Sequence, residues 1–213
     1  GFVEGLFGNA IEFDGKEHTS NSIIDIPYNA SFEDITDRLT MSAWVWRDSE
    51  SIVPERGGRV ANVAVLGHDY QDGRGANGIF FGFHNTLYKM SFRTTTGYYD
   101  NYAGYAPLAG WNHIVTTYDG STSKLYANGV LVGEVAASGS IVLNGDTGSD
   151  LSRFTLSGFY DLRPMPVLPY GNSSGITDEV DGRMDEVKIF SSVLGAEEVR
   201  QLFEQGLATG QVL

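Results

Sequence analysis

The chain has no cysteine, few basic residues and no long apolar run. The absence of cysteine among 213 residues excludes disulfides, thiolate metal sites and cysteine nucleophiles. Only 14 Lys and Arg stand against 27 Asp and Glu, and a net charge of -13 repels nucleic-acid phosphates and anionic lipid surfaces. No apolar stretch approaches the roughly 18 residues that span a bilayer, and the start lacks a basic-then-apolar signal sequence. We therefore expect a soluble domain, excised from a larger protein, with no nucleic acid and no membrane insertion.

The residues that are abundant suit a folded sheet protein. Hydrophobic residues make up 41% of the chain and charged residues 19%, and glycine occurs 27 times. Low charge with many glycines favours a turn-rich fold over disorder, and a chain of this length buries a substantial core as one unit. We therefore predict a single domain over residues 1–213.

Short apolar or alternating runs, separated by Gly, Asn and Asp, predict one strand after another. These runs lie at 10–13, 22–26, 41–46, 60–66, 78–83, 87–95, 111–118, 123–127, 130–135, 154–159 and 184–190. Asp-Gly at 119–120 and Asn-Gly at 128–129 suit tight turns, so 111–135 predicts a three-stranded meander. One helix is predicted at 196–205, with Gly206 as its stop.

Four polar segments are longer than connections within a sheet require. They span residues 47–59, 68–77, 96–110 and 160–181. In a compact domain, loops of such length are typical of functional sites, so we expect ligand-binding residues there.

Several motifs follow one another in the order of a known family. They are residues 8–15, 39–45, 111–120, 125–129 and 185–187. In this order they resemble the laminin-G-like, concanavalin A-like lectin and glucanase domains, across nearly the whole chain. The resemblance implies an all-β, two-sheet antiparallel jelly-roll β-sandwich with one short C-terminal helix. It also implies an extracellular binding scaffold, similar to bacterial carbohydrate-binding modules. One departure is Gly195, where the family usually places a Ser or Thr helix cap.

The resemblance also implies that the N-terminal and C-terminal strands pair, which would bring Asp14 near Asp185. Carboxylate and carbonyl oxygens could converge there on calcium, a cation that takes roughly six to eight oxygen ligands. We predict calcium as a structural cofactor held by Asp14 and Asp185. In the alternative reading, which stays open, Asp14 shapes a turn and Asp185 accepts backbone hydrogen bonds.

Loop tyrosines beside polar residues suggest a sugar site. Sugars present apolar C–H faces and hydroxyl rims, which suit a flat ring flanked by hydrogen-bonding side chains. Two loops and the long 160–181 segment carry such groups. The predicted ligand residues are His68, Asp69, Tyr70, Arg74, Tyr99, Asn101, Tyr102, Tyr160 and Arg163. Alternatively, these tyrosines only cover a sheet edge.

The sequence thus predicts a noncatalytic, calcium-stabilised carbohydrate-binding domain that works beside other domains of a parent protein. Its expected partner is a carbohydrate or cell-surface glycan. Two alternatives stay open, an adhesion domain for protein, peptide or glycoconjugate ligands and a polysaccharide hydrolase or lyase. Glycosidases of the same broad fold use carboxylates at alternate positions of one strand. Glu179 and Asp181 begin such a pattern, but Arg183 follows, which disfavours a hydrolase.

Overall fold

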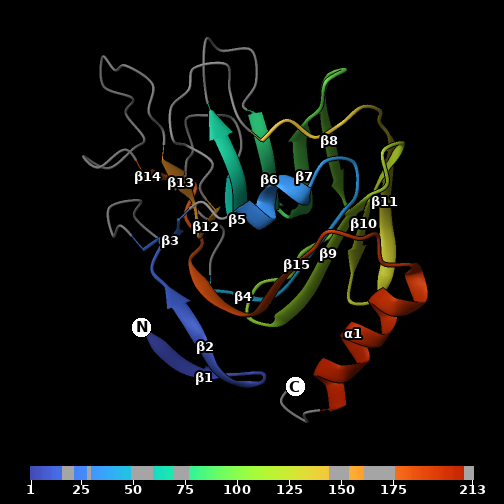
Figure 1. The fold of residues 1–213 in the computed structure, drawn as a ribbon. Helices are drawn as coiled ribbons and strands as arrows, with labels where there is room; N and C mark the ends of the chain where they lie inside the picture. The colour runs from blue at the N-terminus through green and yellow to red at the C-terminus, as the bar shows by residue number, and fades with distance from the viewer. Residues whose placement is uncertain are drawn as a thin grey trace.

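The computed structural model describes residues 1–15, 22–27, 30–48, 60–69, 77–143, 154–160 and 176–208. Almost all of its regular structure is strand (Figure 1). The elements are β1 (Phe2–Gly5), β2 (Gly8–Phe13), β3 (Ile24–Ile26), the 3-10 helix η1 (Ala30–Asp34), β4 (Leu39–Arg47), β5 (Val60–Asp69), β6 (Asn77–His84), β7 (Leu87–Arg93), β8 (Tyr98–Ala103), β9 (Trp111–Tyr118), β10 (Thr122–Ala127), β11 (Val130–Ala136), β12 (Phe154–Leu156), β13 (Phe159–Tyr160), β14 (Ile176–Thr177), β15 (Gly182–Phe190) and α1 (Ala196–Ala208).

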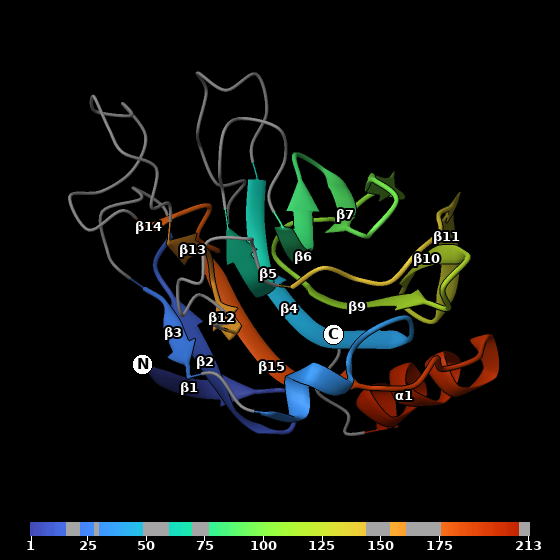
Figure 2. The same cartoon turned by 45° about the horizontal axis from the view of Figure 1, so that its top comes forward.

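The strands form two antiparallel sheets that stack as a sandwich (Figure 2). The seven-stranded sheet has the order β1-β2-β15-β4-β9-β10-β11, and the six-stranded sheet has the order β3-β12-β5-β6-β7-β8. Strands β13 and β14 pair separately. The predicted all-β architecture and the β9-β10-β11 meander are both confirmed.

The hydrophobic core lies between the two sheets. Met41 and Ile114 reach it from the seven-stranded sheet, and Phe81 and Met90 reach it from the six-stranded sheet. Because side chains alternate between the faces of a strand, every second residue of these strands points away from the core. The outer faces of the two sheets are therefore the surfaces on which a site can be built.

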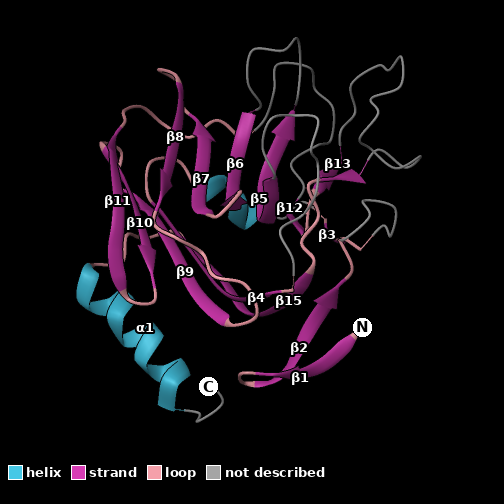
Figure 3. Ribbon diagram, turned by 180° about the vertical axis from the view of Figure 1, so that it is seen from behind, coloured by secondary structure: helices cyan, strands magenta, loops and turns pink. Residues whose placement is uncertain are grey.

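Helix α1 lies on the outer face of the seven-stranded sheet (Figure 3). Phe203 stacks on Trp44 of β4, with ring centroids 5.6 Å apart. The predicted stop at Gly206 is wrong, because the helix continues through it to Ala208. The reason is steric: a Cβ at Gly206 would overlap the Trp44 indole, so glycine is needed for close packing rather than for ending the helix.

Strand β8 lies within a segment that the sequence predicts as a loop, and this prediction is wrong. Residues 98–103 pair in register with β7, from Arg93↔Tyr98 to Tyr88↔Ala103. The Tyr99 ring also stacks on Phe92 at 5.6 Å. The ladder and this packing outweigh the turn-forming tendency of the Asp and Asn in the segment. The ladder consequently places Tyr98 and Tyr102 on one face of an edge strand and Tyr99 on the other.

Candidate functional site

The outer face of the six-stranded sheet gathers polar and aromatic side chains near its β8 edge. The core-facing residues of β7 alternate with Lys89 and Ser91, which point outward. The register places Tyr102 opposite Lys89 and Asp100 opposite Ser91. His84 of β6 completes the group, because its ring centroid lies 5.0 Å from that of Tyr102. We refer to these five residues as the outer-face cluster.

Hydrogen bonds hold Tyr102 in one orientation. Its hydroxyl donates to Asp100 Oδ1 at 2.9 Å, and Ser91 Oγ donates to the same oxygen at 2.5 Å. Burial of the phenol raises the pKa of Tyr102 to about 12, so the hydroxyl keeps its proton at neutral pH and remains a donor. The side chain is nevertheless 40% exposed. The cluster therefore presents a positioned aromatic ring beside a carboxylate.

Two buried polar side chains, Lys89 and Asn62, lie beneath this surface. Lys89 Nζ donates to Asn62 Oδ1 at 3.3 Å, and Asn62 Nδ2 is buried without a hydrogen-bond partner. Burial lowers the pKa of Lys89, whereas Asp178 and Asp100 act to raise it. Burial also lowers the pKa of His84, and the charge of Lys89 adds to this effect, so the imidazole is neutral at pH 7.

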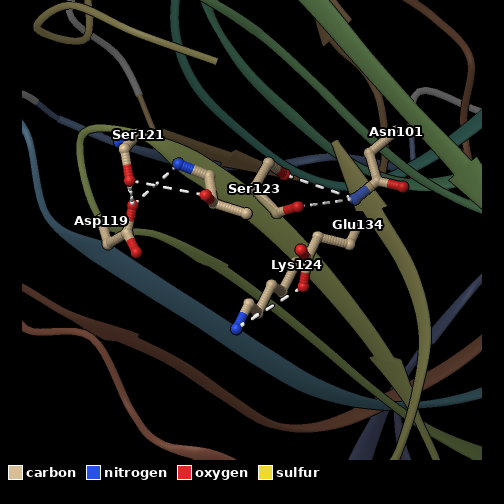
Figure 4. Close-up of polar contacts among 7 residues, drawn as sticks. Asn101, Asp119, Ser121, Ser123, Lys124 and Glu134 are labelled. Atoms are coloured by element: carbon tan, nitrogen blue, oxygen red, sulfur yellow. Dashed lines mark hydrogen bonds and ion pairs between the residues drawn. The ribbon is translucent and has the colours of Figure 1, made fainter. Parts of the chain in front are cut away.

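The structure divides the predicted β8 residues between two faces. Tyr102 belongs to the outer-face cluster, but Tyr99 and Asn101 point to the other side of the strand. Asn101 is only 2% exposed, and its Nδ2 donates to the backbone oxygen of Ser123 in β10 at 3.2 Å (Figure 4). The Tyr99 hydroxyl lies 3.0 Å from Thr96 Oγ1. Asn101 thus ties the two sheets together and does not face a ligand bound beside Tyr102.

The remaining predicted ligand residues are not brought to the outer-face cluster by any described contact. Tyr70, Arg74 and Arg163 lie outside the described residues. His68 and Asp69 end β5, where Asp69 pairs with Asn77, and Tyr160 lies in β13. The side chains of these three residues are likewise outside the described part, so their role as ligand residues stays a prediction.

The predicted pairing of the chain ends is confirmed, but it does not bring the two predicted metal ligands together. Phe13 of β2 pairs with Gly182 of β15, and the two strands run antiparallel. Asp14 therefore lies on one side of this pair, whereas Asp185 lies three residues away on the other side. At roughly 3.3 Å per residue, the register separates Asp14 and Asp185 by about 13 Å. These two carboxylates are therefore too far apart to share one ion.

The Asp185 carboxylate accepts hydrogen bonds from the turn of the β1-β2 hairpin. Its Oδ2 accepts the backbone N–H groups of Leu6 and Phe7 at 2.8 and 2.9 Å, and its Oδ1 accepts that of Glu186 at 2.9 Å. These partners are donors, whereas calcium needs a shell of oxygen ligands. Within the described ranges no group of three or more His, Asp or Glu side chains is placed to hold a metal. The described surroundings of Asp185 do not fit a calcium ion, and calcium binding by this chain stays a prediction.

The acidic residues Glu179 and Asp181, which begin the incomplete glycosidase-like pattern, do not form a pair on a strand. Residues 178–181 precede β15, which begins at Gly182. Glu179 is fully buried, and its Oε1 accepts the backbone N–H of Ser22 at 2.8 Å. Such a carboxylate ties chain segments together and is not presented to a substrate.

Sequence reasoning missed Lys89, Ser91 and Asn62 as parts of the site. A signal was present for the first two, because apolar residues at 88, 90 and 92 alternate with Lys, Ser and Arg. That alternation predicts a strand with one polar outer face. Asn62 gives no comparable signal, since β5 is interrupted by an irregularity between Asn62 and Ala64 that shifts the register.

Comparisons with known proteins agree with this architecture. A family model described as the concanavalin A-like lectin/glucanases superfamily matches residues 18–200. No curated protein matches the chain. In the described residues, no helix has the length and apolar character needed to cross a membrane.

Several solved structures share the fold at low sequence identity. Domain 4 of AbnA, a GH43 extracellular arabinanase from Geobacillus stearothermophilus, in complex with arabinotriose, is 19% identical with a TM-score of 0.60, covering 94% of this chain and 79% of that one. The Ruminococcus gnavus IT-sialidase CBM40 bound to α2,3 sialyllactose is 15% identical with a TM-score of 0.64, covering 91% and 96%. The binding domain of Paraclostridial Mosquitocidal Protein 1 is 16% identical with a TM-score of 0.54, covering 96% and 45%. At these identities the likeness concerns the fold, which is that of carbohydrate-binding modules and binding domains of larger proteins. Because the family model spans most of its length, this chain belongs to the concanavalin A-like lectin/glucanases superfamily.

Proposed function

We propose that this chain is a noncatalytic carbohydrate-binding domain of a larger extracellular protein, and that the sugar binds at the outer-face cluster. The observation that carries this proposal is the Tyr102 side chain, which is 40% exposed yet held through its hydroxyl by Asp100. A sugar ring can stack on such a fixed aromatic face while the neighbouring carboxylate accepts hydrogen bonds from the hydroxyl groups of the sugar. Tyr98, 37% exposed on the same side of β8, extends this surface.

The chemistry of the cluster supports binding rather than catalysis. A general base works best when its pKa lies near the operating pH. Burial raises the pKa of Tyr102 to about 12, so its phenolate is scarce at neutral pH. Asp100 Oδ1 already accepts two hydroxyl groups and has no second carboxylate of the cluster opposite it. A retaining or inverting glycosidase needs such a facing pair.

The two ligands named for the structural neighbours support a sugar as the class of partner. Arabinotriose and sialyllactose are both oligosaccharides, bound by domains of similar fold. The neighbour from an extracellular arabinanase likewise supports an extracellular parent protein. The different-class alternative, an interaction domain for a protein or peptide, would use the same exposed surface.

Glycan binding tests the proposal directly. The purified chain is screened against an array of plant, bacterial and animal oligosaccharides, and hits are measured by isothermal titration calorimetry with calcium or with a chelator. Tyr102→Ala is expected to weaken binding at least about tenfold, the effect of losing a central aromatic contact. Phe2→Ala is the matched control, because Phe2 is an aromatic side chain 78% exposed on β1 of the other sheet.

Three outcomes would contradict the proposal. Binding to a protein or peptide without any glycan hit would favour the interaction domain. Release of reducing ends from a polysaccharide would show an enzyme. Glycan binding that Tyr102→Ala leaves intact would place the site elsewhere on the chain.

A further inference from the structure

The outer-face cluster combines one exposed carboxylate, that of Asp100, with a buried lysine, Lys89, whose ammonium group is hydrogen-bonded inside the protein. From this arrangement we infer that the ligand is a neutral sugar, that sugars carrying a carboxylate are rejected, and that Asp100 sets this preference. The inference rests on the proposed function and adds the class of ligand to it.

Lys89 lies opposite Tyr102 in the β7-β8 ladder, but its charge is not presented to a ligand. The residue is buried, and its ammonium group donates to Asn62 Oδ1 at 3.3 Å. Burial lowers the pKa of Lys89, and the nearby acidic groups of Asp178 and Asp100 act in the opposite direction, so two acidic groups lie near one ammonium. A ligand carboxylate would add a third negative charge at this place, without an exposed cation in the cluster to receive it.

Asp100 is the charged group that the cluster exposes. Ser91 and Tyr102 both donate to its Oδ1, which fixes the carboxylate beside the Tyr102 ring. A sugar stacked on Tyr102 can donate a hydroxyl proton to such an acceptor, because a carboxylate only accepts hydrogen bonds. A sugar carboxylate can only repel it. Two charges about 4 Å apart in water interact by about 1 kcal/mol, which corresponds to about fivefold in affinity.

Among the described residues of β7 and β8, Arg93 offers a competing site for an acidic sugar. It lies on β7 opposite Tyr98, two residues along from Ser91, and therefore on the outer face. If an acidic sugar binds at all, its carboxylate would sit toward Tyr98 and Arg93 rather than toward Tyr102. Substitution of Arg93 separates this arrangement from the one we infer.

Matched ligands that differ only in charge test the inference. Affinities are measured for sialyllactose and its methyl ester, and for free and methyl-esterified oligogalacturonate of equal length, together with neutral hits from the array. In the wild-type chain the neutral member of each pair is expected to bind at least about fivefold more tightly. Asp100→Asn keeps the Oδ1 acceptor for Ser91 and Tyr102 but removes the charge, so it is expected to abolish that ratio.

Asp25→Asn is the control for the change in net charge. Asp25 lies on β3, at the edge of the sheet opposite to β8. Five strand spacings of about 4.8 Å place it roughly 24 Å away, well beyond the Debye length of about 8 Å at physiological salt. This variant is expected to keep the wild-type ratio. At 1 M salt the Debye length falls to about 3 Å, so the wild-type ratio should shrink while neutral binding is unchanged.

The outcomes separate the inference from the proposed function. Tighter binding of the acidic member, lost in Arg93→Gln or in Tyr102→Ala, would overturn the neutral preference and leave sugar binding at this face intact. A neutral preference that Asp100→Asn does not change would overturn the role of Asp100. Absence of binding to every sugar would refute the proposed function itself.

Discussion

His113 offers a test of how the seven-stranded sheet is covered. This imidazole is 1% exposed, and it lines a cavity of about 40 Å³ beneath α1 together with Ser42 and Lys188. Its Nε2 lies 3.0 Å from Ser42 Oγ, and its ring stacks on Trp44 with centroids 4.9 Å apart. Burial first, and then the charge of Lys188, lower the pKa of His113 from 6.5 to about 4. The folded protein therefore holds this ring in its neutral form.

The sign and size of the effect follow from linkage. Because the folded pKa lies below the unfolded value, the unfolded chain binds the proton first as the pH falls. The stability associated with the neutral ring is complete above pH 6.5 and is lost progressively down to about pH 4. A difference of about 2.5 pKa units at about 1.36 kcal/mol each amounts to about 3 kcal/mol in total. About 2 kcal/mol of this is lost by pH 5.

Urea unfolding of the wild type and of His113→Gln at several pH values between 7.5 and 5 measures this loss. Glutamine keeps polar atoms near Ser42 but does not titrate. Because the substitution also changes packing, only the change with pH of the stability difference between the two proteins is informative. The 27 acidic residues are common to both proteins, so their contribution cancels in that difference. We expect the advantage of the wild type to shrink by about 2 kcal/mol between pH 7.5 and pH 5.

A difference that stays constant with pH would refute the reasoning. If His113→Gln does not fold, the pKa of His113 can be read directly from its imidazole resonances in the wild-type chain. A value near 4 agrees with the buried ring, whereas a value above 6 would show that His113 is accessible to water and that α1 does not cover it.

Three further predictions concern stability and are measured by urea unfolding at pH 7.5. Gly206→Ala is expected to lower the free energy of unfolding by about 1–3 kcal/mol, because a Cβ there overlaps the Trp44 ring, although alanine favours helix. Gly195→Ser, at the start of the same helix, is expected to raise it by about 0.3 kcal/mol through a better cap. A Gly206→Ala variant as stable as the wild type would contradict the close contact. Asp185→Asn is expected to cost about 1–3 kcal/mol through weaker acceptance of the hairpin amides, equally with calcium and with a chelator. A loss seen only with calcium would show that Asp185 holds the ion.

Strands that alternate cleanly and end at strong turns were predictable from the sequence. The run at 111–118 coincides with β9, because apolar residues and flanking turn dipeptides agree there. Strand β8 was not predictable in this way, since Asp100 and Asn101 interrupt its tyrosines with residues that favour turns. Its existence depends on the hairpin ladder to β7, which the local residue pattern does not indicate. Helix α1 was predictable, but the packing of Gly206 on Trp44 was not, because no local pattern records which strand lies beneath.

The site was predictable in residue type but not in arrangement. The sequence singled out tyrosines beside Asp and Asn, and Tyr102 with Asp100 does form such a group. It also named Tyr99 and Asn101, which the alternation of β8 turns toward the other sheet. Once a segment is treated as a loop, its side chains have no assigned faces. A one-residue difference in strand position then decides whether a residue meets a ligand or the core.

The asymmetry between the two outer faces supports the proposed position of the ligand. On the seven-stranded sheet, α1 covers Trp44 and His113, so aromatic side chains there are used in packing. On the six-stranded sheet, the aromatic ring of Tyr102 is held instead by hydrogen bonds and stays partly exposed. A partly exposed ring forgoes part of the free energy gained by full burial. Because its orientation is maintained by Asp100 rather than by a covering helix, the Tyr102 ring stays partly exposed to a partner that can replace water on it.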